Sequence, residues 1–205
     1  MKVLGINGSP RKGGNTEIII NRVLDGLKKR GWETDYAQIG GQVFRGCIAC
    51  GGCFKNQDGK CTIKEDRFNE VFAKMTEADA IIIGSPTYFA DVTSETKALL
   101  DRAGYVAIAN GHLLKGKIGM AVSAVRRGGS IHVIDTINHF MHLSRMIVPG
   151  STYWNMVYGR NKGEVEGDEE GLANMDHLAA VTDWLGRAVK PVLDSYPLTG
   201  ASCAD

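Results

Sequence analysis

The sequence lacks the features of a membrane or exported protein. No hydrophobic run in the 205 residues approaches the roughly 18 residues that a membrane-spanning helix needs. The first residues, Met1 to Ile6, lead directly into a strand pattern and contain no apolar core of a signal peptide. We therefore expect a cytoplasmic protein that makes no contact with membranes and whose thiols stay reduced.

The sequence also lacks an excess of charge of one sign. Lysine and arginine number 24 against 23 for aspartate and glutamate, so the formal net charge is +1. A nucleic-acid-binding domain needs a basic patch, and an acidic electron carrier needs a surface that docks on basic partners, so neither class fits this balance. With 43% hydrophobic and 23% charged residues, the composition is that of a globular protein, and the length predicts one domain.

Apolar patterns of two periods alternate along the chain. Short apolar runs predict buried strands, whereas apolar residues at positions i, i+3, i+4 and i+7 predict amphipathic helices. The predicted strands cover residues 2–7, 32–39, 80–84, 117–125 and 146–149. The predicted helices cover residues 15–30, a stretch after Asp66, residues 93 or 94 to 103, residues 130–145 and residues 172–193.

The spacing also predicts which side chains of the helices face the core. Asn15 is expected as the N-cap of the first helix. The inward-facing residues of that helix are expected to be Ile19, Ile20, Val23, Leu24 and Leu27, and those of the next helix Phe68, Val71, Phe72 and Met75. In the last helix we expect Leu178, Trp184, Leu185 and Ala188 to face inward. The Gly- and acid-rich stretch 161–171 is predicted to be a surface loop.

Alternating strands and helices predict an α/β fold with a parallel sheet covered by helices on both faces. Five strands in this order fit the flavodoxin-like, doubly wound sheet with strand order 2-1-3-4-5. We expect one domain over residues 1–205, with a cysteine-rich insert at 44–63. In such sheets ligands bind beyond the carboxyl ends of the strands, between the first and third strands.

The loop after the first strand has the composition of a phosphate site. It reads Gly-Ser-Pro-Arg-Lys-Gly-Gly-Asn-Thr over residues 8–16, and it lacks both the Gly-Lys-Ser/Thr ending of a Walker A loop and the Gly-x-Gly-x-x-Gly dinucleotide pattern. Its polar donors are Ser9, Arg11, Asn15 and Thr16, next to the N-terminus of a helix. The alternative is a flexible glycine-rich turn without a ligand. One phosphate in a sheet of this type points to FMN.

Two further loops follow the third and fourth strands at the same edge of the sheet. The first contains Pro86, Thr87, Tyr88 and Phe89, an aromatic pair suited to a flat apolar ring, although such residues also cap protein cores. The second runs from Ser123 to residue 129. Its glycines allow close approach of the backbone to a ligand, and its two arginines suit either phosphate or NADPH contacts or a solvent-facing position.

Four of the five cysteines lie within fifteen consecutive positions, as Cys47, Cys50, Cys53 and Cys61. Three thiolates at two-residue spacing and a fourth after a short loop suit a [4Fe–4S] cluster. Structural zinc sites more often use two separated Cys-x2-Cys pairs. Zinc, and free or oxidised thiols without metal, remain as alternatives, and Cys203 is expected to take no part.

The three loops, together with the pair Asp101-Arg102 downstream of the second, resemble the NAD(P)H-dependent FMN reductase and multimeric flavodoxin superfamily. The cysteine segment is similar to that of its iron–sulfur flavoprotein branch. The resemblance implies that the FMN phosphate is held by Ser9, Arg11, Asn15 and Thr16. It implies that the ring system is flanked by Pro86, Thr87, Tyr88 and Phe89, with Ser123 and Gly128 near it. It also implies a [4Fe–4S] cluster on the four clustered cysteines.

The resemblance implies an FMN-dependent oxidoreductase that passes electrons between FMN and a [4Fe–4S] cluster. FMN carries the chemistry, so no catalytic acid or base from the protein is expected. A cluster-free NAD(P)H-dependent FMN or quinone reductase and a flavodoxin-like electron carrier remain as alternatives. We expect a small-molecule or protein electron donor and acceptor, with NAD(P)H as a candidate donor. We also expect a homodimer or homotetramer, from the resemblance and from the number of aromatic residues near the site: Tyr88, Phe89, Tyr105, Trp154 and Tyr158.

Overall fold

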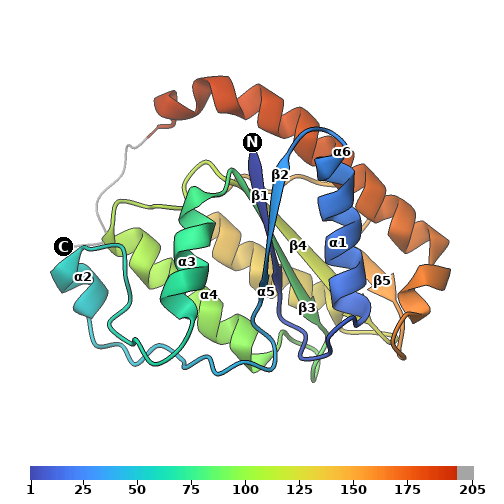
Figure 1. Ribbon diagram of the computed structural model, residues 1–205, viewed down its shortest axis with the longest axis horizontal. Helices are drawn as coiled ribbons and strands as arrows, with labels where there is room; N and C mark the ends of the chain where they lie inside the picture. Colours follow the sequence, from blue (N-terminus) through green and yellow to red (C-terminus); the bar gives the residue numbers. More distant parts are fainter. Residues whose placement is uncertain (198–205) are drawn as a thin grey trace.

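A five-stranded parallel sheet forms the centre of the protein (Figure 1), for which the computed structural model describes residues 1–197. The strand order is β2-β1-β3-β4-β5, which confirms the predicted flavodoxin-like topology. The inner strands are nearly all buried because helices cover both of their faces. From one edge to the other, the strands are β2 (Glu33–Gln38), β1 (Lys2–Asn7), β3 (Ala80–Pro86), β4 (Ile118–Val125) and β5 (Met156–Tyr158).

Helices pack on both faces of the sheet, and each face has its own apolar core. One face is covered by α1 (Asn15–Lys28) and α6 (Glu169–Val189). The other is covered by α3 (Phe68–Glu77), α4 (Ser94–Ala109) and α5 (Ser130–Leu143), as Figure 1 shows. Shorter helical segments are α2 (Gly52–Asn56), η1 (Glu164–Gly167) and η2 (Lys190–Ser195).

The apolar stripes predicted for the first two helices are confirmed. All five predicted residues of α1 are buried, and so are all four of α3. Phe68 and Phe72 of α3 stack with their ring centroids 5.6 Å apart. Full burial of an aliphatic or aromatic side chain contributes about 1.5–3 kcal/mol, so these stripes fix how both helices sit on the sheet.

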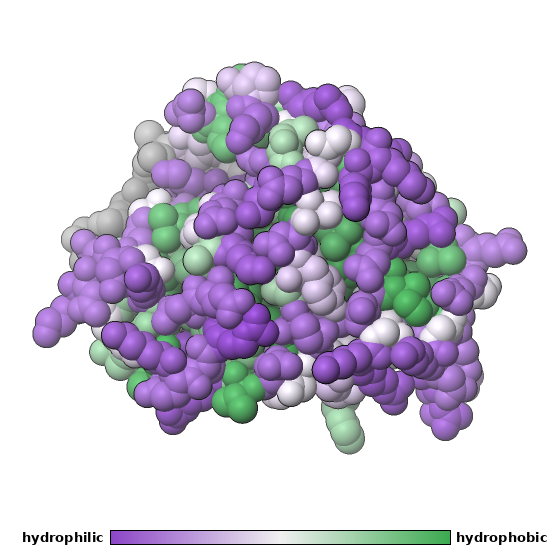
Figure 2. All heavy atoms as spheres, viewed as in Figure 1, coloured by the Kyte–Doolittle hydropathy of each residue, from purple (hydrophilic) through white to green (hydrophobic). Residues whose placement is uncertain are grey.

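The face seen in Figure 2 is mostly hydrophilic, and hydrophobic residues occur there in small separate groups. None of the helices within residues 1–197 combines the length and the apolar character that crossing a membrane requires.

The predicted fifth strand was wrong. Of residues 146–149, Ile147 forms a single parallel bridge with Ile118 at the start of β4, and the edge strand β5 lies farther along the chain at Met156–Tyr158. Pro149 has no N–H to donate to a ladder, so the extended segment ends there. The chain returns to the edge of β4 after an irregular stretch and pairs with the end of that strand.

The predicted ends of α1 and α4 also differ from the structure. Gly14, not Asn15, is the N-cap residue of α1, and no side chain caps the helix there. The prediction ended α4 near Ala103, but the helix continues through Gly104 to Ala109. Glycine inside a helix costs about 1 kcal/mol, and burial of Val106, two residues after Gly104, outweighs this cost.

The inward face predicted for the last helix was partly wrong. Leu178 is buried, but Trp184 is 67% exposed and Ala188 is exposed as well. The buried face near the helix end uses Gly186 instead, where an added Cβ would lie 2.6 Å from the ring of Trp32. The helix thus turns its glycine toward Trp32, and Trp184 faces solvent.

Candidate functional site

A cavity of about 210 Å³ lies at the carboxyl ends of the strands, and we call it the strand-end cavity. Four loops contribute to it, those that follow β1, β3, β4 and β5, which is where ligands bind in doubly wound sheets. The predicted site residues that line it are Ser9, Arg11, Asn15, Thr16, Pro86, Thr87 and Tyr88. The lining residues that the prediction did not assign are Ala124, Arg126, Gly159, Arg160 and Lys162.

The loop between β1 and α1 is held in one conformation by its own side chains. Asn7 Oδ1 accepts a hydrogen bond from the N–H of Ser9 at 2.9 Å, and Ser9 Oγ accepts one from the N–H of Arg11 at 3.3 Å. An added Cβ on Gly40 would lie 2.3 Å from the carbonyl oxygen of Gly8, so only glycine fits behind the loop. These contacts place the N-terminus of α1, which attracts anions, at the cavity.

The strand-end cavity is positively charged. Arg11, Arg126, Arg160 and Lys162 line it, and no Asp or Glu does so in the part of the chain that the structure describes. The hydroxyls of Ser9 and Thr16 lie among these cations and are buried. Cationic side chains, hydroxyls and a helix N-terminus together are the groups that bind a phosphate monoester.

The segment after β5 is part of this cavity, although the sequence predicted a surface loop from residue 161. The buried Asn15 side chain fixes it: Nδ2 donates to the carbonyl oxygen of Asn161 at 2.9 Å, and Oδ1 accepts from the N–H of Gly163 at 2.8 Å. Arg11 also donates to the carbonyl oxygen of Arg160 at 3.2 Å. The sequence pattern predicted the fifth strand at 146–149 rather than at 156–158. It therefore did not indicate that residues 159–163 form a loop at the end of a strand.

The loop after β3 forms a tight turn at the rim of the cavity. Tyr88 and Asp91 exchange two backbone hydrogen bonds of 2.8 and 3.0 Å. The two residues between them, Phe89 and Ala90, have φ of +46° and +67°, a conformation that costs non-glycine residues about 1–2 kcal/mol each. Tyr88 lines the cavity, whereas Phe89 is fully exposed and does not line it.

The third predicted loop contributes less to the lining. Ser123 is buried at the end of β4, and its hydroxyl lies 3.3 Å from that of Thr87, so it supports a lining residue from behind. Gly128 does not line the strand-end cavity. Arg126, whose position was left open by the sequence, is a lining residue.

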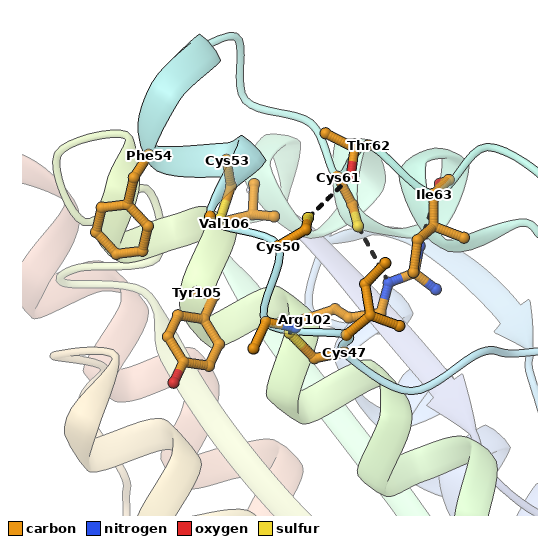
Figure 3. Close-up of a pocket in the computed structure, with 13 residues that line it drawn as sticks. Cys47, Cys50, Cys53, Phe54, Cys61, Thr62, Ile63, Arg102, Tyr105 and Val106 are labelled. Carbon is orange, nitrogen blue, oxygen red and sulfur yellow. Dashed lines mark hydrogen bonds between the residues drawn. The ribbon is translucent and has the colours of Figure 1, made fainter.

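A second cavity of about 210 Å³, here the cysteine cavity, lies between the segment that follows β2 and helix α4 (Figure 3). Cys47, Cys50, Cys53 and Cys61 all line it. Arg102, Tyr105 and Val106 of α4 and Ile48, Phe54 and Ile63 of the cysteine segment line it as well, so most of its wall is apolar. It has no lining residue in common with the strand-end cavity.

The four thiols have different surroundings within this cavity. The hydroxyl of Thr62, 3.2 Å from Cys50 Sγ, lowers the pKa of the Cys50 thiol, whereas burial raises the pKa of Cys53. Cys61 Sγ accepts a hydrogen bond from Arg102 Nε at 3.4 Å. Cys47 Sγ accepts one from the N–H of Ala49 at 3.4 Å.

The donor set fits an iron–sulfur cluster in its chemistry. Four soft thiol ligands share one largely apolar cavity that also contains N–H donors to sulfur, and such clusters are held by four cysteine thiolates. Within residues 1–197, however, no three His, Cys, Asp or Glu side chains already converge as a set of metal ligands. Cys203 lies outside the described residues.

Comparison with known proteins identifies the family. Residues 1–160 match the family model of NADPH-dependent FMN reductases. The chain is 37% identical to an iron-sulfur flavoprotein of Methanocaldococcus jannaschii over 87% of its own length and 93% of the relative's. It is 42% identical to an iron-sulfur flavoprotein of Methanosarcina thermophila over 73% of its own length and 78% of the relative's.

A solved structure supports the fold. RosB, determined with a bound 8-demethyl-8-formylriboflavin-5'-phosphate, superimposes with a TM-score of 0.75 over 97% of this chain and 82% of RosB, at 19% sequence identity. At this identity the likeness establishes the fold, whereas the family match establishes the flavin chemistry. The chain therefore belongs to the NADPH-dependent FMN reductase family, in its iron–sulfur flavoprotein branch, and is an FMN-dependent oxidoreductase.

Proposed function

We propose that this protein couples FMN in the strand-end cavity to a [4Fe–4S] cluster on Cys47, Cys50, Cys53 and Cys61. The observation that carries the proposal is that all four thiols, spread over fifteen positions, line one cavity. The names of the two relatives, both iron-sulfur flavoproteins, support it. FMN exchanges electrons in pairs or singly and a cluster exchanges them singly, so the pair connects two-electron donors with one-electron acceptors.

We assign the FMN phosphate to the cationic end of the strand-end cavity. The hydroxyls of Ser9 and Thr16 and the guanidinium of Arg11 bind it, and Asn15 holds the segment that carries Arg160 and Lys162 against it. Charge-assisted hydrogen bonds of this kind select a phosphorylated flavin over riboflavin, which lacks the phosphate. No step in this assignment requires a titrating acid or base from the protein.

We assign the ring system to the loop after β3. Pro86, Thr87 and Tyr88 line the strand-end cavity, and the exposed Phe89 follows them in the same turn. Ser123 supports Thr87, and Gly128 lies in the neighbouring loop. These residues would hold the ring system, and the bound FMN would exchange electrons with NAD(P)H or another small-molecule or protein electron partner.

The surroundings of the site support an assembly of identical subunits. Tyr88, Phe89, Tyr105, Trp154 and Tyr158 are all at least 44% exposed, although aromatic side chains are highly or intermediately buried on average. We propose a cytoplasmic homodimer or homotetramer, each chain a single FMN-binding domain with the cysteine-rich insert at 44–63. A light-scattering mass equal to one chain at micromolar concentration would contradict it.

The second candidate is a cluster-free NAD(P)H-dependent FMN or quinone reductase. One observation favours it: the four thiols share a cavity, but no three of them converge as metal ligands in the described residues. In this case the segment 44–63 would be a structural or substrate-binding insert, and the strand-end cavity alone would carry the activity.

Iron and sulfide analysis of protein purified without oxygen distinguishes the two candidates. The first predicts about four iron and four sulfide per chain together with one FMN, and near-complete loss of iron in Cys61→Ala with FMN retained. Cys203→Ala is the matched control and should keep its iron. Wild-type protein with FMN but neither iron nor sulfide would overturn the cluster and support the cluster-free reductase.

A further inference from the structure

Arg102 of α4 is the largest side chain that is completely buried in the described chain, and the flavin site does not use it. An arginine inside a protein is costly unless each of its N–H groups finds an acceptor. Apolar residues of similar size in such positions usually give equal or greater stability. A guanidinium here therefore calls for an explanation other than packing.

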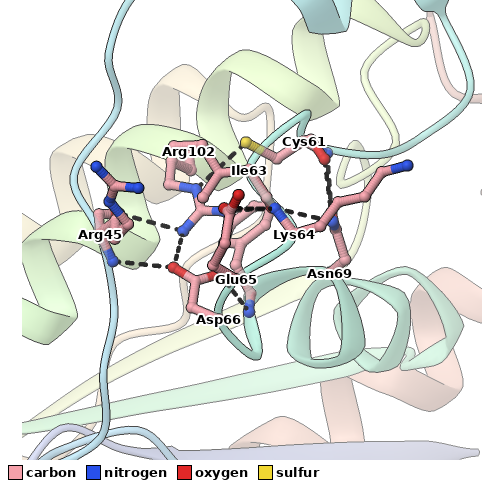
Figure 4. Close-up of polar contacts among 9 residues, drawn as sticks. Arg45, Cys61, Ile63, Lys64, Glu65, Asp66, Asn69 and Arg102 are labelled. Carbon is pink, nitrogen blue, oxygen red and sulfur yellow. Dashed lines mark hydrogen bonds and ion pairs between the residues drawn. The ribbon is translucent and has the colours of Figure 1, made fainter.

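The donors of this guanidinium point to the segment that contains the cysteines (Figure 4). Nη1 donates to Asp66 Oδ2 at 2.5 Å and to the carbonyl oxygen of Arg45 at 3.1 Å. Nη2 donates to the carbonyl oxygen of Ile63 at 3.2 Å, and Nε donates to Cys61 Sγ at 3.4 Å. The plane of a guanidinium lets one side chain hold these groups at the same time.

The oxygen acceptors lie at the two ends of residues 45–66, the segment that contains all four cysteines. Arg45 comes just before the first of the four cysteines, and Ile63 and Asp66 come just after the last. Asp66 strengthens the junction, because its carboxylate also accepts the N–H of Arg45 at 2.9 Å and the N–H of Phe68 at 3.1 Å. Burial acts to raise the pKa of Asp66, but the hydrogen bond from Arg102 and those from the two amides hold the pKa below its ordinary value, so the carboxylate is ionised at neutral pH.

The ring of Phe68 also packs against the Arg102 guanidinium. The guanidinium carbon lies 4.1 Å from the centroid of this ring, in a cation–π contact. Phe68 begins α3 and is itself fully buried, so the junction is anchored to the sheet core on one side and to α4 on the other. The side chains of Arg102 and Asp66 are both completely shielded from solvent.

We propose that Arg102 is a positioning residue that closes the segment 45–66 on α4 and fixes Cys61 Sγ in the cysteine cavity. Closure of the segment is a property of the metal-free chain. The further consequence, that the Nε–H donor at Cys61 raises the reduction potential of a bound cluster, rests on the proposed function. Lysine retains the charge but has no planar set of donors, so it cannot replace arginine at this position.

Hydrogen exchange of the metal-free, full-length chain tests the closing role. The variants are Arg102→Lys and the double variant Arg102→Met with Asp66→Asn, which leaves no buried charge unpaired. We expect amides of residues 45–66 to exchange about tenfold faster or more in both, with amides of β1, β3 and β4 unchanged. The matched controls are Arg67→Lys and Arg67→Met with Glu70→Gln, a neighbouring ion pair on the surface, and they should leave exchange unchanged.

Two outcomes of this experiment would overturn the proposal. Exchange of residues 45–66 at the wild-type rate in both variants would show that the guanidinium does not close the segment. Equal acceleration in the segment and in the sheet strands, or global unfolding, would show that the buried pair stabilises the whole fold instead.

The reduction potential of protein that has been reconstituted with iron and sulfide tests the contact between Arg102 and Cys61. We expect Arg102→Lys to lower the reduction potential or to lose its iron, and Arg67→Lys to do neither. A wild-type potential with full iron content in Arg102→Lys would overturn the role at Cys61. Wild-type protein that takes up no cluster would refute the proposed function, while the exchange experiment on metal-free protein still decides the closing role.

Discussion

The two cavities have similar volumes but are built in opposite ways. The strand-end cavity takes short pieces from four loops, and the parallel sheet fixes where each of these loops begins. The cysteine cavity comes mainly from one irregular segment laid over α4, with a single short helix of its own. One cavity is cationic and polar, and the other is largely apolar.

This difference shows what holds each site. In the strand-end cavity, the hydrogen-bonded ladders of the sheet fix where each contributing loop begins. In the cysteine cavity, the segment has no ladder, and a buried ion pair between Arg102 and Asp66 takes over that role. We therefore expect strand-end variants to affect ligand affinity, and cysteine-segment variants to affect local order.

The largest effect is expected from Gly40→Ala, which breaks the backbone support of the strand-end cavity. Its Cβ would lie 2.3 Å from backbone atoms of Gly8 and Ser9, and backbone cannot move aside as a flexible side chain does. We expect a loss of about 3 kcal/mol in the free energy of unfolding, at the upper end for overpacking, and weaker FMN binding. Urea unfolding and a flavin fluorescence titration measure both.

The matched control for this variant is Gly46→Ala in the cysteine segment. No atom lies within 4 Å of the added Cβ there, and the residue has no left-handed backbone. This variant should keep wild-type stability and FMN affinity. Equal losses in the two variants would show that the effect comes from replacing glycine rather than from the clash.

The next largest effect is expected from the double variant Arg11→Ala with Thr16→Ala. It removes a cation and a hydroxyl from the proposed phosphate site, so FMN affinity should fall by about 1.5–3 kcal/mol, or about 10- to 150-fold. Affinity for riboflavin should stay the same, because it has no phosphate. Lys12→Ala, next in sequence but outside the cavity lining, is the control. Unchanged FMN affinity would place the phosphate elsewhere.

A smaller effect is expected from Asn15→Ala, which separates the loop after β5 from the phosphate site. The variant loses the two hydrogen bonds to Asn161 and Gly163, at about 1–2 kcal/mol in total. FMN affinity should fall by about 5- to 30-fold, since Arg160 and Lys162 are no longer held in place. Asn21→Ala, exposed on the same helix, should have no effect. Binding as tight as in the wild type would show that this loop does not contribute.

The sequence predicted the sheet order and most of the strand-end cavity, because both follow from buried apolar patterns and from where strands end. It failed at β5, since the apolar run ending at Pro149 looks like a strand, whereas the three-residue strand Met156–Tyr158 has too short a pattern to recognise. The error carried over to Arg160 and Lys162, which follow that strand.

The cysteine cavity was predictable in its thiols but not in its supports. The spacing of the four cysteines is visible in the sequence, but the donor to Cys61 lies 41 positions away on α4. Nothing in the periodicity of α4 marks Arg102 as buried, because an arginine in an amphipathic helix ordinarily faces solvent. The contact depends on the path of an irregular segment, and only a tertiary structure shows that path.

The smallest effect is expected from relieving the left-handed backbone strain that occurs in each of the two regions. Ala90 at the rim of the strand-end cavity and Ala49 in the cysteine segment have φ of +67° and +52°. Replacement by glycine removes the cost of the left-handed backbone, about 1–2 kcal/mol at each position. The greater freedom of glycine in the unfolded chain offsets about 0.5–1 kcal/mol of this gain. Ala90→Gly and Ala49→Gly should therefore each raise the free energy of unfolding by about 0.5 kcal/mol, whereas Ala73→Gly, on the exposed side of α3, should lower it by about 1 kcal/mol. We expect FMN affinity to stay within about twofold of the wild type in both stabilised variants. The two backbone hydrogen bonds of the Tyr88–Asp91 turn remain in Ala90→Gly, and Ala49 does not line the strand-end cavity. A marked loss of FMN binding in Ala90→Gly alone would show instead that the strained turn holds Tyr88 in place for the flavin.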